Sequence, residues 1–551
     1  MGYDKMTPVQ AMTIRPGLAG KDIVAQAKTG TGKTIAFLLP VIQRIIEEDR
    51  SLSNPMSKKR SSAKDVRAIV LSPTRELAEQ IAAEARRLVR GTGVIVQAAV
   101  GGTQKNQMLR KTREEGCHLL VATPGRLLDI LSDPTSGIDA PRLAALVLDE
   151  ADRMLDVGFE AALQDILRML PSRSEHDRQT LLYSATIPTD VVRLAKAYVN
   201  PKNFEFVQTV KEGEVPTHEK VPQYIVPCNG FENLFPAAYE LMVKEIERAD
   251  STNEPFKAIM FLPTTASVQL AYEAFSRLSR RHRKLPHVLS IHSKLTQRQR
   301  TASSDRFRQA QSAILISSDV TARGMDFPNV SHVIQVIAPS DREQYIHRIG
   351  RTGRADKNGQ AWLFVPRLEL NTARSNLHSL PIKRHDGLQA AMLDLTSNNE
   401  EAMQNPAVRD VLDAMRDVDD EAKQEAYLSI FGSLKNIRNK QEYADALHDM
   451  TVYGWGMPEP PAIPESLARM RNLHGLRGVN IVRRSSNRDQ QGPARGRRDG
   501  FRGRDGGFQS RESGRGRGRS ENSPWEQFES RSQRDGRRTN FRETRAPRAT
   551  F

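Results

Sequence analysis

The alternation of short apolar runs with helical patterns constrains the fold of this 551-residue chain more than any other feature. Each apolar run ends in polar residues, glycine or proline, and amphipathic segments such as 76–89 separate the runs. Strands that alternate with helices form a parallel sheet covered by helices on both faces. The first group of expected strands is 22–27, 68–73, 118–124, 145–150 and 180–186, and the second group is 257–265, 287–293, 312–326, 332–338 and 360–366. The sequence therefore predicts an α/β chain with two tandem parallel-sheet units.

The predicted boundaries follow from where these patterns start and stop. They are 1–205 for the first unit, 206–222 for a linker, 223–370 for the second unit, 371–482 for a helical C-terminal extension and 483–551 for a tail. Ligands of open α/β sheets bind at the carboxyl ends of the strands, and paired domains bind them in the cleft between.

The tail differs from the rest of the chain in composition. It contains 19 Arg, no Lys and 9 acidic residues, so +10 of the total charge of +16 lies there. Such a segment cannot bury enough apolar surface to fold and is predicted to be disordered. Its RG repeats, interleaved with Phe and Trp, favour binding of nucleic acid through phosphate attraction and stacking. A solubilising tail is the alternative.

An acidic turn follows one of the expected strands. The apolar run 146–148 ends in Asp149-Glu150-Ala151-Asp152, which is costly unless a cation lies close by. A solvated turn at the end of a strand would explain the pattern equally well if this stretch stood alone.

A glycine-rich loop upstream changes that balance. Residues 27–34, AKTGTGKT, follow a strand and precede a helical pattern, and Ala27 stands where the general phosphate-loop pattern has Gly. Gly30 and Gly32 let backbone N–H groups approach phosphates at a helix N-terminus. Lys33 is expected to reach the β- and γ-phosphates, while Thr34 and Asp149 hold Mg²⁺, partly through water. Glu150 is expected to orient or deprotonate the attacking water. The nucleotide-binding residues of this loop are Ala27, Lys28, Thr29, Gly30, Thr31, Gly32, Lys33 and Thr34.

The phosphate loop and the DEAD sequence together resemble the DEAD-box RNA helicase family, and further motifs match that family in order over residues 3–366. The resemblance implies two RecA-like domains, ATP and Mg²⁺ as cofactors, and RNA as partner. It makes Gln10 the residue that selects adenine, adds Gly324 and Asp326 to the nucleotide site, and makes His347, Arg351 and Arg354 catalytic residues of the second unit. The implied RNA contacts are Pro73, Thr74, Arg75, Gly101, Gly102, Thr123, Pro124, Gly125, Arg126, Gln297, Arg300, Thr321 and Arg323. Ser184, Ala185, Thr186 and Asp152 are implied to couple ATP state to unwinding.

Physical reasoning supports the RNA contacts as a set. Turns at strand ends offer hydroxyls, N–H groups and guanidinium to phosphates, which positions RNA without reading its bases. Each turn alone could be a plain turn with a surface arginine. Asp152 is expected to pair either with the sixth motif, 347–354, or with the segment 184–186.

The extension suggests a narrower resemblance. The stretch 453–476 after a helical block is similar to fungal mitochondrial DEAD-box proteins that act as RNA chaperones in group I and II intron splicing. A stabilising cap on the second unit is the alternative reading. The resemblance implies the mitochondrial matrix, although no transit peptide is visible, and a monomer. We expect no membrane span.

Three functions compete at this point. The favoured one is an RNA-dependent ATPase that locally unwinds or remodels RNA. The second is an ATP-gated RNA clamp or scaffold with slow turnover, and the third is a DNA helicase or translocase. Cys117 and Cys228, without a CxxC, argue against disulfide or zinc chemistry.

Overall fold

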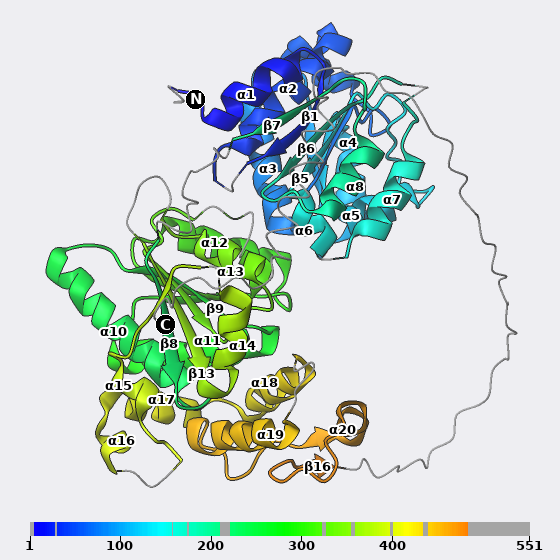
Figure 1. Ribbon diagram of the computed structural model, residues 1–551. Coiled ribbons are helices and arrows are strands. Elements are labelled where there is room, and N and C mark those ends of the chain that lie inside the picture. Colours follow the sequence, from blue (N-terminus) through cyan, green and yellow to red (C-terminus); the bar gives the residue numbers. More distant parts are fainter. Residues whose placement is uncertain are drawn as a thin grey trace, which may run out of the picture.

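The computed structural model describes residues 5–482, apart from 28–29, 157, 174–175, 210–220, 322–324, 326, 354–358, 379, 397–399 and 434–438. The predicted tail, 483–551, therefore lies outside the described residues. Two α/β units follow each other, and helices of the extension lie beneath the second (Figure 1).

The first unit is built on a seven-stranded sheet with the order β3-β4-β2-β5-β6-β1-β7, and all its pairings are parallel. Its strands are β1 (Asp22–Gln26), β2 (Ala68–Leu71), β3 (Val96–Ala99), β4 (Leu119–Ala122), β5 (Ala145–Asp149), β6 (Gln179–Ser184) and β7 (Phe204–Gln208). Helices α1 (Pro8–Leu18), α2 (Lys33–Glu48) and α3 (Arg75–Leu88) pack on one face. Helices α4 (Lys105–Glu115), α5 (Pro124–Leu131), α6 (Ala151–Asp156), α7 (Glu160–Met169) and α8 (Thr189–Tyr198) pack on the other.

The second unit repeats this architecture. Its sheet has the order β10-β11-β9-β12-β13-β8-β14, which is the order of the first sheet when each is counted from its own first strand. The strands are β8 (Gln223–Cys228), β9 (Lys257–Phe261), β10 (Val288–Ile291), β11 (Ala313–Ser317), β12 (His332–Val336), β13 (Gln360–Pro366) and β14 (Ile382–Arg384). Helices α10 (Leu234–Thr252) and α11 (Thr265–His282) cover one face, and α12 (Gln297–Gln309), α13 (Arg342–Ile349) and α14 (Arg367–Leu377) cover the other.

The sheets extend beyond the predicted boundaries of the units. β7 continues to Gln208, past the boundary at 205, and β14 pairs with β8 at residues 382–384, past the boundary at 370. Both are edge strands with half-exposed or exposed side chains, so they lack the apolar run that marks a central strand. The two α/β units that the sequence predicts are present, with these corrections to their limits.

The extension shares its core with the second unit. Its helices are α15 (Gln389–Met392), α16 (Glu400–Gln404), α17 (Pro406–Arg416), α18 (Asp420–Ser433), α19 (Lys440–Asp449) and α20 (Glu465–Arg471), with a π-helical turn at Met450–Gly454. Tyr427 and Trp455 belong to the same apolar cluster as Phe275 of α11. The extension therefore adds a layer to the helices on one face of the second sheet and is not a separate folding unit.

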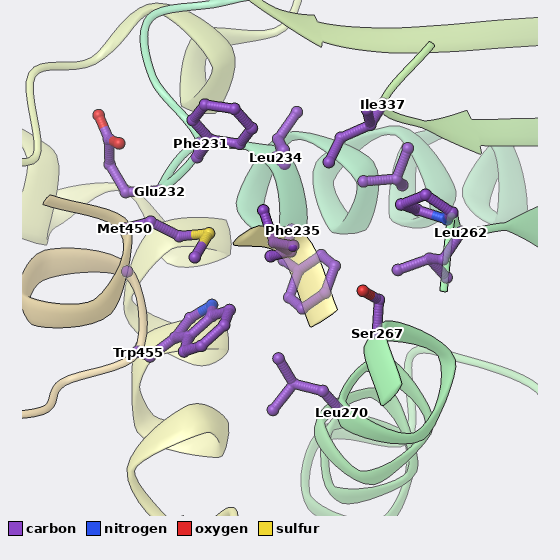
Figure 2. A pocket seen from close by; sticks show the side chains of 14 residues that line it. Phe231, Glu232, Leu234, Phe235, Leu262, Ser267, Leu270, Ile337, Met450 and Trp455 are labelled. Atoms are coloured by element: carbon purple, nitrogen blue, oxygen red, sulfur yellow. The ribbon is translucent and has the colours of Figure 1, made fainter. Parts of the chain in front are cut away.

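A small cavity marks the seam between the two. Its volume is about 40 Å³, and Phe231 and Phe235 line it from the second unit while Met450 and Trp455 line it from the extension (Figure 2). Glu232, at the rim, is 6% exposed. Among the described residues, no helix has the length and apolar character that crossing a membrane requires.

Candidate functional site

The order of the strands divides the carboxyl edge of the first sheet into two halves. β5, β6 and β1 are neighbours, and the residues that follow them are Asp149–Asp152, Ser184–Thr186 and the phosphate loop. β3, β4 and β2 are neighbours in the other half, and the residues that follow them are the predicted RNA contacts of this unit. We call these two parts of the edge the nucleotide half and the RNA half after the roles predicted for their residues, and the two halves adjoin.

The phosphate loop is held by the helix before it. Gly32 is the N-cap of α2 with a φ of 89°, and Gly30 has a φ of 78°, conformations that L side chains rarely adopt. The Gln10 side-chain amide donates to the carbonyl of Gly32 at 3.1 Å. A Cβ on Gly32 would lie 2.6 Å from Gln10 Nε2, so this glycine is needed for the contact. Lys33 Nζ donates to the carbonyl of Ala27 at 3.1 Å, and Lys28 and Thr29 lie outside the described residues.

Two buried carboxyl groups face this loop from the end of β5. Asp149 is 3% exposed and Glu150 is 4% exposed. Burial raises the pKa of Asp149 to about 7, although the nearby Lys33 ammonium opposes the shift. Glu150 has a φ of 51°, a strained value for a residue with a Cβ. Within the described part of the chain its Oε2 is buried without a hydrogen-bond partner.

These groups fit Mg²⁺ and a water molecule. Mg²⁺ is held in nucleotide sites by one or two carboxylates together with water and phosphate oxygens. Such a site does not require three or more His, Cys, Asp or Glu side chains arranged to hold a metal ion, and no group of that kind occurs among the described residues. Thr34, in the first turn of α2, and Asp149 are the residues that would hold the ion. A cation there would favour the charged form of Asp149 and reverse the effect of burial.

Asp152 is directed away from that pair and toward β6. Its Oδ2 accepts hydrogen bonds from the backbone N–H of Thr186 at 3.1 Å and from the Thr186 hydroxyl at 2.9 Å. Its own N–H donates to Ser184 Oγ at 3.2 Å. Ser184 also pairs in register with Gln26, the last residue of β1, and its carbonyl accepts from Ala27 N. Of the two partners left open for Asp152, the segment 184–186 is the one these hydrogen bonds show.

The RNA half forms a platform around Gly101-Gly102. The Arg75 guanidinium lies against this pair, since a Cβ on Gly101 would be 3.2 Å from Arg75 Nε and one on Gly102 only 2.0 Å from its Nη1. Arg126 donates to Thr103 Oγ1 at 3.3 Å and to the Thr103 carbonyl at 3.1 Å. The remaining predicted contacts on this edge are the helix-capping residues Thr74 and Thr123 and their neighbours Pro73, Pro124 and Gly125. Two arginines therefore lie on one backbone loop, where phosphates could reach both.

Two predicted RNA contacts of the second unit instead touch the first unit. Arg300 Nη2 lies 2.6 Å from Glu76 Oε1, and both side chains are buried. Gln297 Nε2 donates to Glu79 Oε2 at 3.1 Å and to Glu76 Oε1 at 3.4 Å. In this arrangement both side chains join α12 to α3, and their contact with RNA stays a prediction.

The sixth motif is anchored inside the second unit. Arg348 is 1% exposed and donates to both Asp319 carboxylate oxygens, at 2.7 and 3.1 Å. Arg351, 2% exposed, donates to the carbonyl of Met325, and His347 is 8% exposed. Arg351, which the resemblance makes a catalytic residue, is therefore packed within its own unit.

The other predicted residues of this unit are described only in part. Thr321 is fully buried, and its hydroxyl has no hydrogen-bond partner in the described part of the chain. The predicted Arg323, Gly324, Asp326 and Arg354 lie outside the described residues.

Sequence reasoning missed the residues that only the fold brings together. Glu79 and Thr301 lie 222 positions apart and share a hydrogen bond of 3.3 Å. Asp319, the partner of Arg348, was missed in the same way. The i, i+3 pair of carboxylates Glu76 and Glu79 after a strand was a visible signal, but nothing in the sequence indicates their partner.

The fold and the site together define a P-loop ATPase with two RecA-like units, the class to which helicases belong. A model of the DEAD/DEAH box helicase domain matches residues 7–194, and a model of the helicase conserved C-terminal domain matches 237–356. The chain is 52% identical to the ATP-dependent RNA helicase cyt-19, mitochondrial, of Neurospora crassa, over all of this chain and 85% of that one. It is 48% identical to the mitochondrial RNA helicase mss116 of Aspergillus fumigatus, over 88% and 75% of the two chains.

A solved structure agrees. Mss116p lacking its NTE and C-tail, bound to ssRNA and AMP-PNP, superposes with a TM-score of 0.72 at 31% identity, covering 88% of this chain and 92% of that one. The chain belongs to the DEAD-box family and is an ATP-dependent RNA helicase.

Proposed function

We propose that this helicase remodels RNA locally, by closing its two units over ATP and a bent single strand. The observation that carries the proposal is the divided edge of the first sheet. β5 lies next to β2 of the RNA half, and Asp152, which follows β5, is hydrogen-bonded to Ser184 and Thr186 at the end of β6. Opening one base pair costs on the order of 1–2 kcal/mol. Differential binding of a bent strand in the closed state could supply this for a few pairs.

The ATPase half works through groups already in place. Lys33 binds the β- and γ-phosphates, Gln10 selects adenine, and Thr34 and Asp149 hold Mg²⁺, which neutralises charge on the phosphates when bound. Glu150, whose free carboxylate oxygen faces no protein donor in the described chain, orients and deprotonates the attacking water. Arg351, Arg354 and His347 complete the site when the units close, and Gly324 and Asp326 bind nucleotide.

The RNA half binds phosphates without reading bases. Arg75 and Arg126 provide charge, and Gly101 and Gly102 let a strand approach the backbone closely. The predicted contacts of the second unit are Thr321, Arg323, Gln297 and Arg300, of which the last two contact α3 in this structure. Asp152 and the segment 184–186 transmit the nucleotide state between the halves.

The names of two relatives support a biological setting, since cyt-19 and mss116 are both named as mitochondrial helicases. We propose that this chain acts in the mitochondrial matrix, as a monomer, on structured RNA such as group I and II introns. The extension and the Arg-rich tail would hold structured RNA near the core.

One experiment separates this function from its alternatives. ATPase rate is measured with and without RNA or DNA for the full chain and for Glu150→Gln. We expect stimulation by RNA only, and loss of most of the rate in the variant. Stimulation by DNA would favour the translocase, and unwinding that survives in Glu150→Gln with a single binding event per duplex would favour the clamp.

A further inference from the structure

The contact between α3 and α12 joins the functional edges of the two units. α3 begins directly after β2, at the turn that carries Thr74 and Arg75, and α12 begins after β10. Glu76 is in the first turn of α3, and Gln297 is the first residue of α12. Because both helices start at carboxyl ends of strands, any contact between their first turns brings those two edges together.

This contact contains two carboxylates of α3, Glu76 and Glu79, and one of them is paired with an arginine of α12. Glu76 pairs with Arg300, which is 5% exposed. Glu79 lies one turn further along the same face of α3, and its Oε2 accepts from Gln297 Nε2 at 3.1 Å and from the Thr301 hydroxyl at 3.3 Å. Burial raises the pKa of Glu79, and the charge of Glu76 adds to that rise.

Glu79 therefore depends on the second unit. Both donors in these hydrogen bonds to Glu79 come from α12. Hydrogen bonds stabilise a carboxylate most when it is charged and partly removed from water. When the units separate, both donors leave and water must replace them. A residue with partners of this kind favours the state in which the units touch.

We propose that Glu79 and Thr301 form a positioning contact that holds the two units with their carboxyl edges together and so sets how readily RNA closes the enzyme. The proposal rests on the closure described under the proposed function. Arg75, next to Glu76 in sequence, ties the same helix to the predicted RNA platform, so that RNA binding and docking of α12 act on one element.

Variants on both sides of the contact test this in the full chain. The RNA concentration for half-maximal ATPase is measured for Glu79→Ala, Glu79→Gln and Thr301→Val, with Glu84→Ala as matched control. Glu84 lies on the same helix and pairs with Arg87 within it. We expect about a tenfold increase for Glu79→Ala and about threefold for Thr301→Val, as loss of hydrogen bonds to a charged group predicts. Glu79→Gln should stay within about twofold, since its carbonyl still accepts both bonds.

A second readout reports the distance between the units. Donor and acceptor dyes on Met56→Cys and Met470→Cys, which are 67% and 73% exposed and lie in the first unit and in the extension, give a transfer efficiency that changes when the units move relative to each other. Cys117 and Cys228 are fully buried, and burial raises the pKa of Cys117 to about 12, so neither competes for the dyes. Glu79→Ala should need more RNA and ATP analogue to reach the closed signal, while its KM for ATP without RNA stays unchanged.

The outcomes separate the proposal from simpler explanations. Equal RNA dependence in Glu79→Ala and Glu84→Ala would overturn it, as would faster ATP hydrolysis without RNA, which would make the contact a restraint. The double variant Glu79→Ala, Thr301→Val should be no worse than Glu79→Ala alone, and additive effects would show that the two residues act separately. If wild-type ATPase ignores RNA, the proposed function fails, while the dye-transfer comparison of Glu79→Ala with Glu84→Ala still decides whether this contact holds the units together.

Discussion

Replacing Gly102 by alanine tests the RNA platform through its most crowded point. Gly102 has a φ of 74°, and an added Cβ would lie 2.0 Å from Arg75 Nη1 and 2.8 Å from its Cζ. Two effects follow. The left-handed backbone costs a residue with a Cβ roughly 1–2 kcal/mol, and the Arg75 guanidinium must leave the loop on which it lies.

Each effect has its own measurement. The backbone cost lowers the melting temperature by about 2–8 °C for a unit of this size. Displacing Arg75 removes about one phosphate contact, so the slope of log affinity against log salt for single-stranded RNA should become shallower by about 0.7. Affinity at moderate salt should fall several-fold, and the KM for ATP without RNA should not change.

Two control variants separate the effects. Gly20 has a φ of 78° at the turn before β1, and its nearest neighbour is Arg44 Nη1 at 3.6 Å, so Gly20→Ala carries the backbone cost alone. Gly125→Ala meets nothing within 4 Å at an ordinary φ and should be silent in stability. If Gly102→Ala binds RNA with the same affinity and salt slope as Gly20→Ala, Arg75 does not contact phosphate from this loop and the reasoning fails.

Two further predictions rest on buried carboxyl groups. Asp152→Ala removes both hydrogen bonds to Thr186, so duplex unwinding should fall at least tenfold more than RNA-stimulated ATPase, and parallel losses in the two assays would contradict the coupling role. Burial raises the pKa of Glu232 to about 7. The folded state then binds a proton that the unfolded state has released, so stability falls as pH rises from about 4.5 to 7. Glu232→Gln should remove that fall and add on the order of 2–3 kcal/mol at pH 8 in urea unfolding; an unchanged pH profile would refute it.

Most central strands of both sheets were predictable because they are buried on both faces. Runs such as 145–149 and 313–317 are wholly buried in the structure, and a continuous apolar run is the pattern such strands require. Four strands of these sheets were missed. β3 is four residues long with glutamine inside, β7 alternates between buried and half-buried residues, and β14 has three residues of which one is buried. β8 was missed as well, although it lies inside the second sheet and is mostly buried. An edge strand forms because it pairs with a strand that is distant in the sequence, so its own residues carry only a weak pattern.

The candidate site likewise contains residues that the sequence could predict and contacts that it could not. Residues within one loop, such as Gly32 beside Lys33, could be predicted because chemistry and spacing occur together in the sequence. Contacts between distant segments could not. Arg300 pairs with Glu76 across 224 positions, and its residue type suits RNA phosphate and carboxylate equally well. Only the placement of α12 against α3 decides between these partners here.

Because Arg300 can bind either a carboxylate or an RNA phosphate, the partner that it has in the closed enzyme affects the mechanism. A guanidinium that is buried against Glu76 cannot bind phosphate at the same time, because its 6% exposed side chain offers no free face to RNA. Binding of RNA by Arg300 would therefore have to break an ion pair between the units, leaving Glu76 and Glu79 without it. Removing one partner of a buried pair costs several kcal/mol, more than one phosphate contact returns. If Arg300 stays with Glu76 when the enzyme closes, Arg300→Lys should reduce the closed signal in the dye-transfer measurement. The dependence of RNA affinity on salt should then stay close to that of the wild type. A reduced slope with unchanged closure would instead assign Arg300 to RNA.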